Sequence, residues 1–156
     1  MSREIKFKAW NGEYFLPLED DGDYYFRDDG NGLELWNKRG RCKNVTLLQF
    51  TGLLDCKGNE IYEGDIVKFH YFYGSGGLEG FVEAEHELTG IVKWGNFGWG
   101  LEAIKGQHWQ GYTGYVAGEG SSNFLDLMAM NESSVHEESF EILGNLYQHP
   151  ELLTNK

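Results

Sequence analysis

The spacing of glycine is the feature of this sequence that most limits what the chain can fold into. Glycine occurs 22 times in 156 residues and proline only twice, and the apolar residues between the glycines come in short runs. Glycine adopts the positive φ angles of tight turns without strain, and it weakens the interior of a long helix. Strand-like runs recur about every ten residues, which predicts a mainly β domain built as a small barrel or sandwich.

Alternation of apolar and polar residues marks the individual strands. Ile5, Phe7 and Ala9 alternate with lysines, and a second alternating run follows the turn signal Asn11-Gly12 and ends at Leu18. We expect these two runs to pair as an N-terminal β-hairpin. Alternation and β-branched content predict further strands at residues 24–27, 33–36, 45–50, 61–62, 66–69, 81–88, 91–94, 99–101, 140–143 and 146–147.

Two short helical segments and one loop complete the predicted secondary structure. Residues 124–128 have apolar side chains at helical spacing, which predicts a short helix. Residues 150–153 suit a terminal helical turn, because proline is tolerated at the first position of a helix. Residues 74–80 are rich in glycine, and we expect a mobile loop there.

The charge of the chain limits its partners. The formal net charge is −12, from 13 Lys and Arg residues against 25 Asp and Glu residues. Affinity for nucleic acid rests on basic side chains that displace counterions from phosphates, and anionic membranes attract basic segments for a related reason. Residues 38–43 form the only basic island. We therefore expect a protein partner, which includes a second copy of the chain, rather than nucleic acid or membrane.

Cysteine content and the N-terminus indicate the compartment. The two cysteines, Cys42 and Cys56, do not make a disulfide framework. The N-terminal residues are charged and lack an apolar signal core, and no apolar run is long enough to span a bilayer. We expect reduced thiols and a cytoplasmic location, with a single disulfide in a secreted protein as the alternative.

Known catalytic and metal-binding patterns do not occur in the sequence. GxSxG and HExxH are absent, and the glycine-rich stretches lack the Lys-Ser/Thr of a phosphate-binding loop. Acidic loops that begin at Asp21 and Asp29 place apolar residues where a calcium loop needs ligands or glycine. We therefore predict no catalytic residue, no metal site and no cofactor. An enzyme stays a lesser hypothesis, because a pocket of convergent groups cannot be seen in a sequence.

A cluster of aromatic residues is the one chemically ambiguous feature. Exposed aromatic side chains could stack against a partner, and protein is the better candidate because basic residues are few nearby. Packing in the core or between subunits is the favoured alternative, since Trp is mostly buried on average. The cluster consists of Trp94, Phe97, Trp99, Trp109, Tyr112 and Tyr115.

Three segments of the chain together resemble the YopX family of proteins. They are the start of the chain at Arg3–Trp10, the long middle segment Leu48–Val67, and a closing segment at residues 140–147 with 150–153. The resemblance implies a core like an SH3-like barrel, an origin in phage or prophage genomes, and no established enzymatic activity. The chain departs from the family pattern at Cys56, where a polar residue is usual, and over residues 95–122, which are longer and richer in aromatics.

The middle segment has a physical interpretation of its own. Gly52, Gly58 and Gly64 are placed as turn residues that can adopt positive φ. Asp65 follows a turn glycine and is expected to bond backbone amides. A segment with this composition holds a compact sheet together and does not need to perform chemistry.

Together these observations predict a single domain over residues 1–156. It would have N-terminal strands and loops over 1–47 and a barrel core over 48–150, with an aromatic insertion near 95–122. Our leading hypothesis is a non-enzymatic protein-interaction or self-assembling module of phage type. The alternatives are a nucleic-acid-associated protein, an acidic mimic of DNA that inhibits a host protein, or an enzyme of unknown class.

Overall fold

The fold was obtained as a computed structural model. It describes residues 5–18, 23–77, 80–95, 98–106, 124–126 and 139–153, with the side chains of 71–86, 105–106 and 124–126 excepted. The strands are β1 (Phe7–Trp10), β2 (Tyr24–Asp28), β3 (Leu33–Asn37), β4 (Gly40–Arg41), β5 (Thr46–Leu54), β6 (Glu60–Tyr62), β7 (Asp65–Gly77), β8 (Gly80–Trp94), β9 (Trp99–Gly106), β10 (Phe124–Asp126) and β11 (Phe140–Asn145), followed by the 3-10 helix η3 (Pro150–Leu153).

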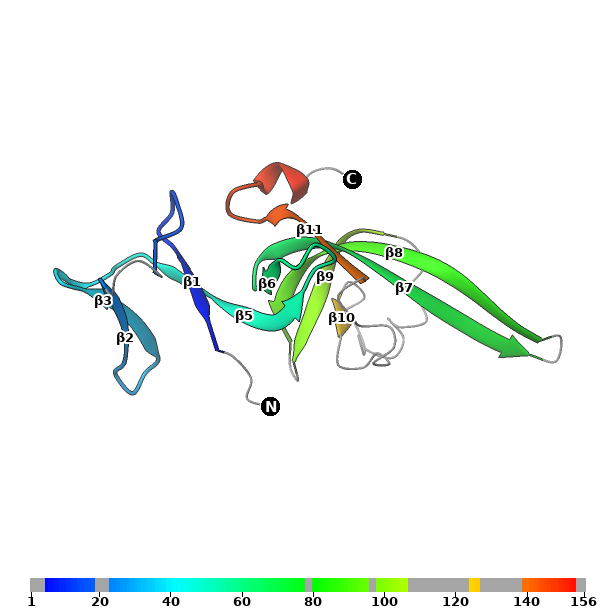
Figure 1. Cartoon of the computed structure of the whole chain (residues 1–156), viewed down its shortest axis with the longest axis horizontal. Coiled ribbons are helices and arrows are strands. Elements are labelled where there is room, and N and C mark those ends of the chain that lie inside the picture. The colour runs from blue at the N-terminus through cyan, green and yellow to red at the C-terminus, as the bar shows by residue number, and fades with distance from the viewer. Residues whose placement is uncertain are drawn as a thin grey trace.

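The strands form three antiparallel sheets. Their strand orders are β10-β9-β8-β7-β11, β1-β5-β6 and β2-β3-β4. Figure 1 shows the five-stranded sheet at one end of the molecule and β2–β4 at the other, with β5 running between them. The predicted mainly β class is confirmed. Within the described residues none of the three sheets closes into a barrel, so the predicted SH3-like barrel is not confirmed.

The hydrophobic core lies on the five-stranded sheet and under β6. Strands β7 and β8 pair continuously from Ile66 opposite Ile91 to Gly77 opposite Gly80. Phe69 on β7 and Phe140 on β11 stack with ring centroids 4.9 Å apart, and both are almost fully buried. Burial of a side chain of this size stabilises the fold by about 2–3 kcal/mol. The buried members of this core are Ile61, Val67, Phe69, Leu88, Val92, Trp99, Leu101 and Phe140.

Strand β5 connects the two ends of the molecule because it changes partner along its length. Its first half pairs with β1, from Phe7 opposite Gln49 to Trp10 opposite Thr46. Its second half pairs with β6, and the register shifts between Phe50 and Leu54. Gly52 lies within this shift at φ +87°, a left-handed conformation that glycine adopts without strain. The glycine predicted to make a turn therefore bends a continuous strand.

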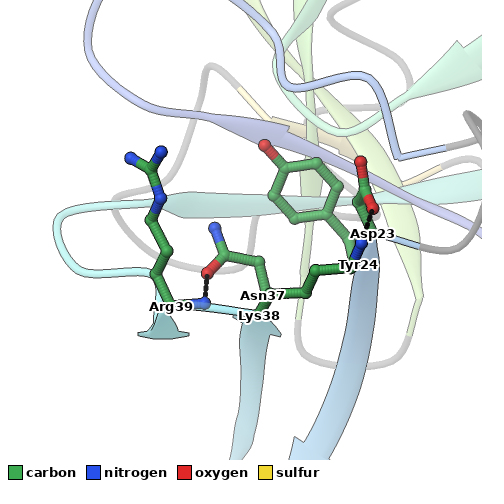
Figure 2. Close-up of a pocket in the computed structure, with 5 residues that line it drawn as sticks. All are labelled: Asp23, Tyr24, Asn37, Lys38 and Arg39. Carbon is green, nitrogen blue, oxygen red and sulfur yellow. Dashed lines mark hydrogen bonds and ion pairs between the residues drawn. The ribbon is translucent and has the colours of Figure 1, made fainter.

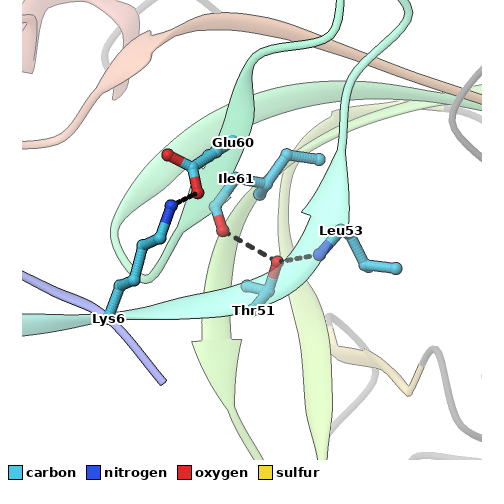
Figure 3. Close-up of polar contacts among 5 residues, drawn as sticks. All are labelled: Lys6, Thr51, Leu53, Glu60 and Ile61. Carbon is cyan, nitrogen blue, oxygen red and sulfur yellow. Dashed lines mark hydrogen bonds and ion pairs between the residues drawn. The ribbon is translucent and has the colours of Figure 1, made fainter. Parts of the chain in front are cut away.

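Side-chain bonds support this change of partner (Figure 3). The Thr51 hydroxyl donates to the carbonyl of Ile61 at 2.8 Å and accepts from the backbone N–H of Leu53 at 3.0 Å. Lys6, which precedes β1, forms a 2.7 Å ion pair with Glu60 of β6. The hydroxyl thus satisfies backbone groups that the irregular pairing leaves without a ladder partner.

Several local predictions require correction. Residues 74–80 were expected to be a loop, but β7 continues to Gly77 and β8 begins at Gly80, because the antiparallel ladder extends through the glycines. Residues 124–128 were predicted to be helical, but 124–126 form β10, which pairs with β9. Pairing with a neighbouring strand outweighed the weak local helical spacing there.

The N-terminal hairpin is only partly formed. Trp10 makes an isolated bridge with Phe15, and Leu16 donates to the carbonyl of Ala9 at 2.9 Å. The main partner of β1 is instead β5, about forty residues further along the chain. The predicted terminal helical turn is confirmed as η3 (Pro150–Leu153).

Candidate functional site

Two residues of the predicted aromatic cluster meet where β8 ends and β9 begins. Trp94 and Trp99 are directly opposite in the β8–β9 pairing, and the backbone N–H of Gly95 donates to the carbonyl of Gly98 at 2.7 Å. Their ring centroids are 4.8 Å apart at an interplanar angle of 86°, an edge-to-face arrangement. Trp99 is 7% exposed and belongs to the core, whereas Trp94 is 53% exposed. The buried ring therefore supports an exposed one.

Of the two alternatives for this cluster, core packing holds for Trp99. Trp94 is exposed, and its role as a platform for a partner stays a prediction. The remaining members, Phe97, Trp109, Tyr112 and Tyr115, lie outside the described residues.

The turn at residues 63–64 joins three segments of the fold. The backbone N–H of Glu63 donates to the carbonyl of Gln49 on β5 at 2.9 Å, and that of Gly64 donates to the carbonyl of Val92 on β8 at 2.8 Å. The backbone N–H of Leu146 donates to the carbonyl of Gly64 at 3.0 Å. This part of the Leu48–Val67 segment therefore ties sheets together, as its composition predicted.

Asp65 closes the same turn from inside the protein. Its Oδ2 accepts a 2.8 Å hydrogen bond from the backbone N–H of Tyr62, and the residue is 7% exposed. The predicted bond from Asp65 to a backbone amide is confirmed. Burial raises the pKa of Asp65 to about 6, although the Tyr62 N–H and the charge of Lys8 both act to lower that pKa. Burial also raises the pKa of Glu63 and of Tyr147.

Asp55 is a second buried carboxylate, and sequence reasoning did not single it out. Its Oδ1 accepts from the backbone N–H groups of Lys57 and Asn59, at 2.9 and 2.8 Å. Its Oδ2 accepts from the backbone N–H of Ile142 on β11 at 3.3 Å. Burial alone would raise the pKa of Asp55, but these bonds together hold it below its ordinary value. The signal in the sequence was an Asp two residues before Lys57-Gly58, a common turn pattern.

A pocket of about 300 Å³ lies at the end of the β2–β4 sheet (Figure 2). Lys38 and Arg39 form the hairpin tip between β3 and β4, and Asn37 Oδ1 accepts from the backbone N–H of Arg39 at 2.8 Å. Lys38 lies 3.4 Å from Asp23 in an exposed ion pair. Figure 2 shows the side chains of Arg39 and Tyr24 on opposite sides of the space. The basic island of residues 38–43 thus contributes its first two cations to a concave surface.

The described histidine and cysteine side chains do not group into a site. His149 Nδ1 accepts from the backbone N–H of Asn145 at 3.2 Å, and His70 lies 3.3 Å from Glu87. Both cysteines are free, with Cys42 half-buried and Cys56 exposed. In the described part of the chain, no three His, Cys, Asp or Glu side chains come together as a metal site would need. The same part contains no helix with the length and apolar character to cross a bilayer.

Comparisons with known proteins place the chain in a family. The YopX protein family model matches residues 6–154. None of the curated proteins matches the chain. Among solved structures, the crystal structure of protein EF1440 from Enterococcus faecalis is similar, with 17% sequence identity, coverage of 97% of this chain and 99% of that chain, and a TM-score of 0.45. Because the family model matches nearly the whole length, the chain belongs to the YopX family.

Proposed function

We propose that this protein is a non-enzymatic protein-interaction module of phage or prophage type, which binds a second copy of itself or another protein through exposed aromatic side chains. The observation that carries the proposal is the exposed indole of Trp94, held edge-to-face on the buried indole of Trp99. A large aromatic ring on a rigid support loses little conformational entropy when a partner covers it. Trp is accordingly enriched among the residues that dominate interface energetics.

The exposed area of the Trp94 side chain is large enough to contribute substantially to binding affinity. A Trp buries up to roughly 250 Å² when it is fully covered, so a half-exposed Trp leaves roughly 100 Å² for a partner. At about 25 cal/mol per Å², covering that area contributes about 2–3 kcal/mol, or a factor of about 50 in affinity.

The environment of the buried acids supports the non-enzymatic part of the proposal. Asp65 has a pKa that would suit proton transfer near neutral pH, but its described hydrogen bond goes to the Tyr62 amide that closes its own turn. Asp55 is likewise engaged with backbone N–H groups of its own turn and of β11. In both cases the described hydrogen bonds of the carboxyl group go to backbone N–H groups of the fold.

Site-specific photocrosslinking tests this function. A photoreactive phenylalanine analogue is introduced in place of Trp94 in the full chain expressed in bacteria, and in place of Leu143 as a matched control. Leu143 is 38% exposed and lies on β11, in the same five-stranded sheet. We expect a discrete crosslinked species, either a dimer or a defined heterologous adduct, from position 94 and not from position 143. A monomer with no adduct from position 94 would refute the proposal.

Sedimentation velocity separates the two kinds of partner. If the partner is a second copy, the sedimentation coefficient of the wild-type protein rises with concentration, and Trp94→Ala shifts that rise to at least about tenfold higher concentration. If the partner is another protein, the purified chain stays monomeric and the adduct from position 94 is heterologous.

A further inference from the structure

The β2–β3–β4 sheet carries a surface that combines arginine and aromatic side chains. Its strands pair with Tyr25 opposite Trp36, Trp36 opposite Arg41, and Arg27 opposite Glu34. Because opposed residues share a face and successive residues alternate, these five side chains lie on one face of the sheet. We call it the arginine–aromatic face. The other face meets β1 through Phe26, which contacts Phe7 at a centroid distance of 5.4 Å and stays 41% exposed.

The two arginines on this face differ in their partners: Arg41 pairs with a carboxylate, and Arg27 lies on an aromatic ring. The Arg41 Nη1 donates to Glu34 Oε2 at 2.8 Å, so that pair is internally satisfied. The guanidinium of Arg27 lies 4.7 Å from the ring centroid of Trp36, and among the described residues it has no carboxylate partner. Stacking on a ring orients a guanidinium, and its N–H groups can still donate two hydrogen bonds to a carboxylate.

The charge of the segment differs from that of its surroundings. Residues 23–43 contain five Lys or Arg against four Asp or Glu, including three of the four arginines. The rest of the chain contains eight Lys or Arg against 21 Asp or Glu. The segment thus has a net charge of +1 and the rest of the chain −13, and screening limits the reach of each charge to about 10 Å, so this sheet repels an anionic group less than its acidic surroundings do.

The edge of β2 indicates which class of anion fits. Strand β2 pairs with β3 on one side, and no other described strand pairs with its second edge. The backbone N–H and C=O groups of an open edge pair with an added polypeptide strand. An added strand would place alternate side chains on both faces, so it would reach Arg27 on one and the pocket beside Tyr24 and Arg39 on the other.

We propose that the open edge of β2 binds an extended acidic segment of a partner protein, with one carboxylate on Arg27 and another in the pocket beside Arg39. This surface lies on a different sheet from Trp94, and the inference rests on the proposed function only in that the partner is a protein. Nucleic acid is the weaker candidate, because it offers no backbone to pair with β2 and the rest of the chain repels a polyanion.

Fluorescence anisotropy with a labelled synthetic peptide tests the proposal. The probe is a short peptide that alternates Glu and Thr, and its controls are the same peptide with Lys in place of Glu and an oligothymidylate of equal charge. We expect saturable binding of the Glu peptide alone. Arg27→Glu should weaken binding at least about tenfold. Lys57→Glu makes the same change of charge at an exposed turn in another part of the chain, and should alter binding by less than about twofold.

Two further measurements keep the result interpretable. Arg27→Gln removes the charge without reversing it, and should weaken binding while thermal unfolding followed by circular dichroism stays like that of the wild type. Amide shifts in a nitrogen–proton correlation spectrum should concentrate on β2 residues, in wild type and in Trp94→Ala alike. The proposal would be overturned by any one of four results. These are no saturable binding of the Glu peptide, equal losses of affinity in Arg27→Glu and Lys57→Glu, amide shifts centred away from β2, or tighter binding of the oligothymidylate than of the Glu peptide. A positive peptide result without a crosslink from position 94 would refute only the Trp94 contact.

Discussion

Replacement of Asp65 by Asn should change how the stability of this protein depends on pH. Burial raises the pKa of this carboxyl from 3.8 to about 6 in the folded protein. An acid whose pKa is higher in the folded state binds more protons there, so the folded state loses relative stability as pH rises between the two pKa values. The loss begins above the unfolded pKa and is complete once the pH exceeds the folded pKa.

The size of the effect follows from the difference between the two pKa values. Each unit corresponds to about 1.4 kcal/mol, so ionisation of Asp65 costs the folded state about 3 kcal/mol at neutral pH. Asp65→Asn keeps an oxygen that can accept the hydrogen bond from the Tyr62 N–H, but it cannot ionise. The variant should therefore gain stability relative to the wild type as pH rises, by about 3 kcal/mol from about pH 4 to about pH 8.

Urea unfolding at several pH values measures this difference. Subtracting the wild-type free energy of unfolding from that of Asp65→Asn at each pH cancels the contributions of the other carboxyl groups. A difference that stays constant within about 0.5 kcal/mol across that range would refute the reasoning, and would mean that water or a neighbouring group solvates the ionised Asp65. Lys8, whose charge lowers this pKa, supplies a second check: Lys8→Met should extend the pH-dependent loss of stability to higher pH.

Three other changes have defined expectations. Asp55→Asn should destabilise the protein at neutral pH. The deficit should shrink as pH falls below 3.8 and through the lowered folded pKa of Asp55, measured in a urea series extended into that acidic range; a deficit that stays constant there would contradict the expectation. Gly64→Ala should lower the free energy of unfolding by about 2–3 kcal/mol, because φ is +87° and a Cβ would lie 2.9 Å from the Tyr147 ring. Gly58→Ala is the control: φ is +82° with open space around the residue, so the loss should be only about 1 kcal/mol. Equal losses in the two variants would show that the ring moves aside. Trp99→Ala should lower the free energy of unfolding by about 3–5 kcal/mol and Trp94→Ala by about 1 kcal/mol, because only Trp99 is buried. Thermal or urea unfolding measures both losses, and the reverse order would contradict the exposures of the two rings.

Much of the local structure follows from residue types alone. Gly52, Gly58 and Gly64 all have positive φ, and the strands β2 and β3 lie within one residue of where alternation predicted them. The bond from Asp65 to a backbone amide was likewise predicted. These features depend on steric limits of single residues and on short-range hydrogen bonds, which any tertiary context leaves in place.

Strand pairing could not be read in the same way. Two pairings depend on partners distant in the sequence. Strand β1 pairs with β5 rather than with the run after Asn11-Gly12, and residues 124–126 form β10 because they pair with β9. The free energy of a β ladder belongs to the pair of strands, so a propensity measured along one strand does not contain it. The same reason explains why β7 and β8 remain paired through residues 74–77, where glycine suggested a loop.

The candidate surfaces show the same division. The sequence by itself determined that aromatic residues gather near Trp94 and that basic residues gather at 38–43, because composition is a property of the chain. Only the tertiary structure decided that Trp99 is buried while Trp94 is exposed, and that Arg27 stacks on Trp36 beside an open strand edge. Exposure depends on which other segments cover a residue, and that depends on pairings between strands that no local pattern encodes.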